Sequence, residues 1–336
     1  GNCAQTNAQD CDDSNPCTVD TCDPKSGCKS DAAKDGQPCQ GDACALSNVC
    51  KTGKCDAGKP RNWLWTDGAA TAKEEVTALT ADGEQTWAGG EVHGGAAGGV
   101  DFGLWRLSAD GTKLAGKTFG TIKGDYLRAL AALSDGGAVA VGRWGASDFA
   151  GTGGDGAILR VDATGAQKWL ATPDASATVE SLDAVLAEKS GVVACGFAQS
   201  NGREQAWLTG VDAAGKTTLD RLWPAGHDAR CRSVVRNGAE YALLVWDKIG
   251  SGQLGLIGAG NQGQPLWRTS APVAGANVVP GLLWRGESGL FAVSSRGDTA
   301  KSGGALFSRF DSRGALQEHV EAVGPWVPRA GRFKRI

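Results

Sequence analysis

The cysteines are the residues with the clearest chemistry, and they are unevenly distributed along the chain. Nine of the eleven lie within the first 55 residues, and the other two are Cys195 and Cys231. The nine are Cys3, Cys11, Cys17, Cys22, Cys28, Cys39, Cys44, Cys50 and Cys55. Such density is typical of a disulfide scaffold that forms in an oxidising compartment. We therefore predict that the cysteines are joined in disulfides.

A zinc site is the alternative use of clustered cysteines. It would need paired C-x2-C spacings or nearby histidines. Successive N-terminal cysteines are separated by four to ten residues, and no histidine lies among them, so disulfides are favoured. Because eleven is odd, a pair between Cys195 and Cys231 across neighbouring repeats would leave one cysteine over, most simply Cys3. The alternative is a bond from one N-terminal cysteine to the later domain.

Oxygen-bearing side chains surround the first cysteines and raise the question of a metal ion. Asp10, Asp12, Asp13 and Asn15 follow one another closely, and calcium requires six to eight oxygen ligands. Short Asp and Asn side chains also cap turns through hydrogen bonds to their own backbone, and this second interpretation is favoured. Calcium in the cysteine-rich segment is the one cofactor that these residues suggest, and we expect no other.

The polar residues show no arrangement typical of catalysis. His93, His227 and His319 lie far apart and outside recognised motifs, whereas a hydrolase needs a nucleophile, a base and an orienting acid together. The segment 151–156 matches G-x-G-x-x-G, but it lies between two expected strands rather than before a helix. We expect a protein that is not an enzyme, with a cofactor-dependent oxidoreductase as the enzymatic alternative.

Twelve tryptophans against two tyrosines is an unusual ratio. Most of the tryptophans recur at fixed repeat positions, which favours a role in the core. Trp87, Trp144 and Trp246 are expected at the loop ends of strands, where an exposed indole can stack on a sugar ring. They are the candidate contacts with a glycan or protein partner.

The chain repeats itself from residue 76 onward, and the repeat is the strongest indication of fold. A turn glycine recurs at intervals of 48–54 residues, as Gly111, Gly165, Gly215, Gly263 and Gly314. Each unit contains four short runs rich in Val, Ala, Leu and Trp, separated by Gly and Asp turns. No run shows the 3.6-residue apolar period of a helix. Repeated four-stranded units of this length predict an all-β protein with a β-propeller.

We expect a disulfide-rich module at residues 1–58 and the propeller at residues 62–336. Trp63 begins a run that is similar to an outer strand of the repeat, so the propeller is expected to begin on an outer strand. The segment after Val320 could pair with that strand and close the ring. Five blades with this shared closure are favoured, and six blades with one incomplete are the alternative.

Two resemblances extend these interpretations. The motif CDDSNPCTVDTCDPKSGC followed by DGQPC closely resembles cysteine-rich repeats of extracellular proteins of myxobacteria and related bacteria, over about residues 10–55. The later repeat resembles propellers of secreted bacterial proteins of undetermined activity, over about residues 60–325. The resemblances imply a secreted or surface-exposed protein and a propeller fold, and they bring no catalytic residue.

Charge and hydropathy narrow the range of partners. The net charge is -3, which is too small to attract a nucleic acid or a membrane surface. No apolar run approaches the ~20 residues needed to span a bilayer. We therefore expect an extracellular or cell-surface protein that binds or builds structure in adhesion, an appendage or an envelope assembly, within a larger complex. A glycan-binding propeller is the alternative.

Overall fold

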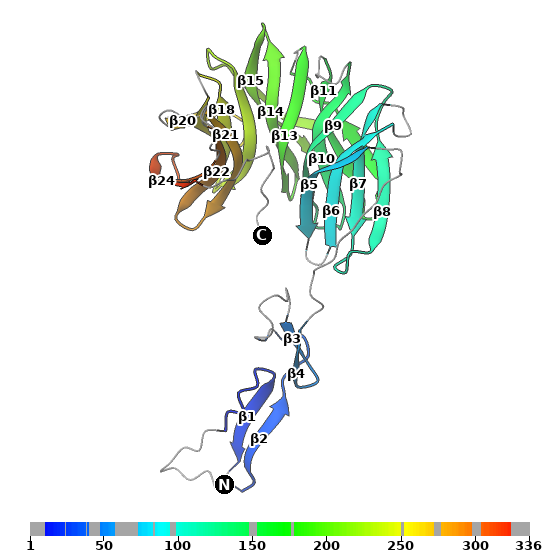
Figure 1. Cartoon of the computed structure of the whole chain (residues 1–336), viewed down its shortest axis with the longest axis vertical. Coiled ribbons are helices and arrows are strands. Elements are labelled where there is room, and N and C mark those ends of the chain that lie inside the picture. The colour runs from blue at the N-terminus through cyan, green and yellow to red at the C-terminus, as the bar shows by residue number, and fades with distance from the viewer. Residues whose placement is uncertain are drawn as a thin grey trace. The chain divides into compact units, whose positions relative to one another are not determined.

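The computed structural model describes residues 11–23, 25–37, 39, 48–57, 73–82, 85–94, 99–147, 153–175, 178–249, 252–271, 277–297 and 304–323. All regular secondary structure in these stretches consists of β-strands (Figure 1), which confirms the predicted all-β class. None of them contains a helix that could span a membrane. The chain divides into two compact units, the first of which contains residues 1–66.

The N-terminal unit contains two short hairpins. Strand β1 (Thr18–Asp23) pairs antiparallel with β2 (Gly27–Ala32), and β3 (Asn48–Lys51) pairs antiparallel with β4 (Lys54–Ala57). Its buried apolar residues, among those described, are Cys17, Ala33 and Cys50. A segment with so small a core needs covalent cross-links to hold one fold.

Within the described residues, the second compact unit contains three four-stranded antiparallel sheets and one eight-stranded sheet, whose two four-stranded antiparallel halves are joined by a single parallel bridge between Val100 and Gly124. These two halves and the three other sheets are here called sheets 1 to 5 in chain order. Sheet 1 contains β5 (Glu74–Asp82), β6 (Gln85–His93), β7 (Val100–Leu107) and β8 (Lys113–Phe119). Sheet 2 contains β9 (Gly124–Ala132), β10 (Ala138–Ala146), β11 (Asp155–Val161) and β12 (Gln167–Ala171). Sheet 3 contains β13 (Val179–Glu188), β14 (Gly191–Ser200), β15 (Arg203–Asp212) and β16 (Thr217–Trp223).

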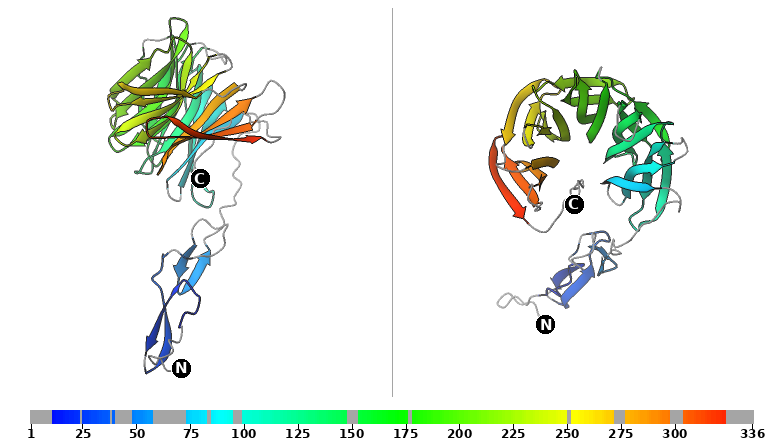
Figure 2. Two further views of the ribbon diagram at one scale, coloured as in Figure 1. Left: turned by 90° about the vertical axis from the view of Figure 1, so that its left-hand side faces the viewer. Right: turned by 45° about the horizontal axis from the view of Figure 1, so that its top comes forward.

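Sheet 4 contains β17 (Ala229–Asn237), β18 (Glu240–Asp247), β19 (Gln253–Ala259) and β20 (Pro265–Ala271). Sheet 5 contains β21 (Asn277–Gly286), β22 (Gly289–Gly297), β23 (Gly304–Phe310) and β24 (Leu316–Val323). The five sheets stand side by side around an arc, as in a β-propeller (Figure 2). The segments on which the predicted ring closure rests, residues 61–72 and 324–336, lie outside the described residues.

The core lies between consecutive sheets. Ile158 of sheet 2 packs with Leu182 and Trp207 of sheet 3, and all three side chains are fully buried. The outer-strand Trp169 also lies against the next sheet, where its indole N–H donates to the carbonyl of Ala213 at 3.0 Å. Trp169 is partly buried against this cluster, which confirms the expected core role for one tryptophan at a fixed repeat position.

The predicted Asp and Gly turns form between the third and fourth strands. In sheet 2 the Asp162 carboxylate accepts backbone N–H bonds from Thr164 at 2.9 Å and Ala166 at 3.0 Å. Gly165 follows with a φ of 77°, which L side chains adopt only at a cost. The turns at Asp212 and Asp311 make the same bonds.

Replacing Gly215 with alanine should lower the free energy of unfolding by about 2 kcal/mol. Its φ is +85°, and an added Cβ would lie 2.9 Å from the Trp169 ring. Gly226→Ala is the matched control, because Gly226 has a φ of +74° but no atom within 4 Å of an added Cβ. Urea denaturation should show a loss of only about 1 kcal/mol for the control. Equal losses would mean that the Trp169 contact contributes nothing.

Candidate functional site

The two ends of the sheets differ in how their strands are connected. At one end, here called the turn face, the connections include the repeated Asp and Gly turns. At the other end, here called the loop face, the first strand of each sheet begins and the second ends. Its second-to-third-strand connections are residues 94–99, 147–154, 201–202, 248–252 and 298–303. Because these connections vary in length while the turns repeat, the loop face is the candidate recognition surface.

The predicted disulfides form wherever the structure describes both cysteines. The bonds are Cys11–Cys28, Cys17–Cys50, Cys39–Cys55 and Cys195–Cys231. Cys22 is also disulfide-bonded. The remaining predicted cysteines, Cys3 and Cys44, lie outside the described residues.

The bond between Cys195 and Cys231 joins β14 of sheet 3 to β17 of sheet 4. Both residues are fully buried among the apolar side chains between these sheets. Of the two arrangements left open by the odd cysteine count, the structure therefore has the pair across neighbouring repeats.

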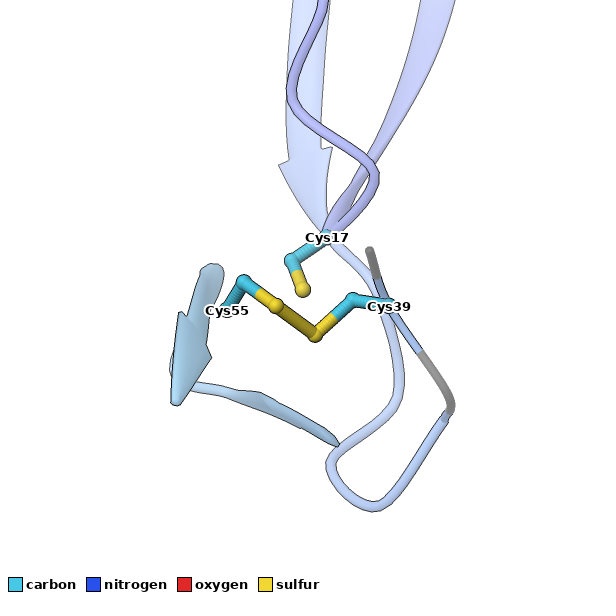
Figure 3. A group of neighbouring side chains, drawn as sticks. All are labelled: Cys17, Cys39 and Cys55. Atoms are coloured by element: carbon cyan, nitrogen blue, oxygen red, sulfur yellow. A yellow bond between two sulfur atoms is a disulfide. The ribbon is translucent and has the colours of Figure 1, made fainter. Parts of the chain in front are cut away.

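Three sulfur atoms of the N-terminal unit come close together. Those of Cys17, Cys39 and Cys55 lie within 4.8 Å of one another, and Figure 3 shows Cys17 pointing toward the bond between the other two. Since all three are disulfide-bonded, none is a thiolate that could bind zinc.

The acidic cluster of the N-terminal unit differs in membership from the predicted one. Carboxylate oxygens of Asp12, Asp13 and Asp20 lie within 4.8 Å of one another, and Asp10 lies outside the described residues. Asp13 accepts bonds from the Thr18 hydroxyl and the Asn15 backbone, both at 2.8 Å. The Thr18 bond, followed by the Asn15 bond, lowers the pKa of Asp13. These bonds support the turn-capping interpretation, and calcium binding stays a prediction.

The three tryptophans predicted as partner contacts have different surroundings. Trp87 lies near the start of β6, is 2% exposed, and donates from its indole N–H to Gly136 at 3.2 Å. The expectation that it faces solvent at a loop end was wrong, because the ring packs under the turn of sheet 2. Trp144 and Trp246 lie near the loop ends of β10 and β18, where both are partly buried. Trp144 meets Phe102 edge-on at 5.3 Å.

A network of charges crosses the loop face between sheets 3 and 4. The Glu204 carboxylate of β15 binds the Arg230 guanidinium of β17 through two bonds and Lys248 at 2.6 Å. Arg230 also lies 4.0 Å from the centre of the Phe197 ring, and Arg143 of sheet 2 lies 5.6 Å from the same ring. This network fixes the loop ends of three consecutive sheets relative to one another.

Sequence reasoning missed a set of bulges along the first strands. At the equivalent point of its ladder with the second strand, each first strand skips one residue: Thr77, Arg128, Asp183, Arg232 and Gly281 in chain order. The first strand of sheet 2 skips Asp125 as well. Arg232 binds Asp183 of the neighbouring sheet at 2.7 Å, and the Thr77 hydroxyl donates to the carbonyl of Leu127 at 3.1 Å. The available signal was a polar residue followed by a small residue and then by Leu or Val, as in residues 128–130 and 183–185.

Exposed apolar side chains also lie on the loop face. Ile122, in the connection from sheet 1 to sheet 2, is 85% exposed, and Ile249, in a connection of sheet 4, is 42% exposed. Lys123 and Lys248 adjoin them in the chain. Isoleucine beside lysine in a connection is suited to contact with another macromolecule.

The histidines are not brought together. His227 lies on the loop face, where its Nε2 is 3.1 Å from the buried carboxylate of Asp247. Arg268 binds the same carboxylate oxygen at 2.5 Å. His93 ends β6 and His319 lies in β24. The contact with Asp247 therefore holds the His227 imidazole ring in place.

Comparison with known families gives a match to the N-terminal unit. A family model described as "Dictyostelium (slime mold) repeat" matches residues 10–30. No curated protein matches the chain.

Several solved structures show a distant likeness to the chain. They include a variant of the Synechocystis apocarotenoid oxygenase, at 12% identity and a TM-score of 0.43 over 75% of this chain and 64% of that one. A second is Drosophila Plexin A in complex with Semaphorin 1b, at 9% identity and a TM-score of 0.45 over 72% of this chain and 52% of that one. A third is a xylan beta-1,4-xylosidase from Bacillus halodurans, at 10% identity and a TM-score of 0.40 over 73% of this chain and 54% of that one. The chain thus spans between half and two thirds of the length of each of these three chains.

Proposed function

We propose that the chain is an extracellular, non-enzymatic binding protein whose loop face contacts a protein or glycan at a cell surface, within an adhesion, appendage or envelope assembly. The sheets hold the loops in fixed positions, and the N-terminal unit is a compact disulfide-linked attachment. Multiple disulfides, including one inside the propeller, are typical of a protein that functions in an oxidising compartment.

The observation that carries the proposal is the difference between the two ends of the sheets. The turn face repeats the same capped turn, whereas the loop face has connections of varied length with Ile122 and Ile249 exposed. Exposed apolar residues in connections cost solubility unless a partner covers them. Because the sheets hold these residues in position, binding a partner would cost little conformational entropy.

Substituting Ile122 and Ile249 with aspartate should weaken binding to envelope material at least about tenfold. Purified envelope protein and polysaccharide fractions would be tested separately by biolayer interferometry, with a glycan array for sugars. Leu114→Asp and Leu266→Asp are the controls, because these residues are 48% and 47% exposed on outer strands β8 and β20. Equal effects of both pairs of substitutions would contradict recognition by the loop face.

The alternative of a cofactor-dependent oxidoreductase has its own inexpensive test. Protein purified under native conditions is expected to absorb only in the ultraviolet, from its aromatic side chains. A visible absorption band that remains with the protein through gel filtration would contradict the proposal that the chain is not an enzyme.

A further inference from the structure

One position of the third strands is buried in four sheets and open in the fifth. Counted from the turn glycine, the equivalent residues are Leu104, Ile158, Leu208, Leu256 and Phe307. The first four are at most 1% exposed, whereas Phe307 is 46% exposed. Its cross-strand neighbour Val320 is 55% exposed. We call Phe307 and Val320 the last face.

The first strands show the opposite pattern. The residue before each bulge is Val76, Leu127, Leu182, Cys231 and Pro280 in chain order. The last four are buried, whereas Val76 is 49% exposed. Leu79, three positions on, is 51% exposed. We call Val76 and Leu79 the first face.

The two faces are the two halves of one kind of contact. At each junction between sheets, a third-strand residue packs in one cluster with a first-strand residue of the next sheet. The pairs are Leu104 with Leu127, Ile158 with Leu182, Leu208 with Cys231 and Leu256 with Leu283. The fourth pair uses Leu283, the counterpart of Leu79, so the continuation of this series would place Phe307 against the first face, Val76 and Leu79.

We propose that the last face of one molecule packs on the first face of a second copy of this chain. Both faces are exposed in the part of a single chain that the structure describes, and a second copy supplies the half that each lacks. The contact continues the series of interfaces that the chain already forms four times. Because the two faces differ, the association is heterologous, so that each added copy leaves one face of each kind open. The contact lies on sheet faces, so it can fail without affecting recognition by the loop face.

Sedimentation velocity of the full chain over a range of micromolar concentrations tests the proposal. Wild type should form dimers and larger species as the concentration rises. The first-face variant Val76→Asp/Leu79→Asp and the last-face variant Phe307→Asp/Val320→Asp should each remain monomeric. An equimolar mixture of the two should form dimers and nothing larger, because each variant retains the face that the other lost. The control Leu114→Asp/Leu266→Asp should associate like wild type.

A monomeric wild type at every concentration, or a mixture that does not dimerise, would overturn the proposal. Hydroxyl-radical footprinting of wild type gives a readout that does not depend on how the variants fold. Oxidation of Val76 and Phe307 should fall as concentration rises, while oxidation of Leu114 stays constant. Protection that is the same at all concentrations would show that the chain covers its own faces, and would equally refute association.

Discussion

Replacing both Cys195 and Cys231 with alanine is expected to lower the free energy of unfolding of the propeller by about 4 kcal/mol. The bond closes a loop with a sequence separation of 36 residues, and both residues are fully buried between sheets 3 and 4. Removing it releases a restraint on the unfolded chain and takes two sulfur atoms out of a packed core. Urea denaturation followed by tryptophan fluorescence measures the change.

Reducing agent provides the control for this disulfide. It should lower the stability of the wild-type propeller to that of the double variant, while leaving the propeller transition of the double variant unchanged. The N-terminal unit, which has little core of its own, should unfold in both proteins under these conditions. A loss of less than about 1 kcal/mol in the double variant would show that packing alone holds sheets 3 and 4 together.

Glu204→Gln is expected to lower the free energy of unfolding by about 2 kcal/mol at neutral pH. The Glu204 carboxylate, 14% exposed, is shared between Arg230 and Lys248, so its neutralisation leaves two cations side by side. Glu318→Gln is the matched control. The pair of Glu318 with Arg309 has a distance of 3.6 Å and exposed partners, and its loss should change stability by less than about 0.5 kcal/mol.

The same substitution should change the response to acid. Burial raises the pKa of Glu204, but the hydrogen bonds and charges of Arg230 and Lys248 outweigh burial and lower it below the ordinary value. A carboxyl with a lowered folded pKa stabilises the fold above its unfolded pKa, and this stability is lost as pH falls through the folded pKa. The stability difference between wild type and Glu204→Gln should therefore shrink on acidification below the ordinary pKa of 4.5. A difference that is constant down to strongly acidic pH would contradict the charge network.

The fold was predictable because its signals are local and repeated. The apolar runs and the Asp and Gly turns recur in each unit, and Gly165, Gly215 and Gly314 all adopt the positive φ that glycine permits. The density of cysteines similarly predicted disulfides, because it depends on composition alone. Pairing partners among the N-terminal cysteines required coordinates, since spacing does not specify connectivity.

The loop face was less predictable because its contacts join residues far apart in the chain. Glu204 meets Lys248 at a separation of 44 residues and Arg230 at 26. The prediction for Trp87 was wrong because its indole N–H donates to the carbonyl of Gly136, in the neighbouring sheet, and the ring does not face solvent. Burial at a given repeat position also depends on whether a neighbouring sheet is present, as the contrast between Leu104 and Phe307 illustrates.

Hydroxyl-radical footprinting of the chain with and without its envelope partner fraction tests recognition by the loop face most directly. Oxidation of Ile122 and Ile249 should fall on binding, whereas oxidation of Leu114 and Leu266 on the outer strands should not change. Protection confined to the outer strands or to the turn face, with Ile122 fully reactive in the complex, would contradict the account.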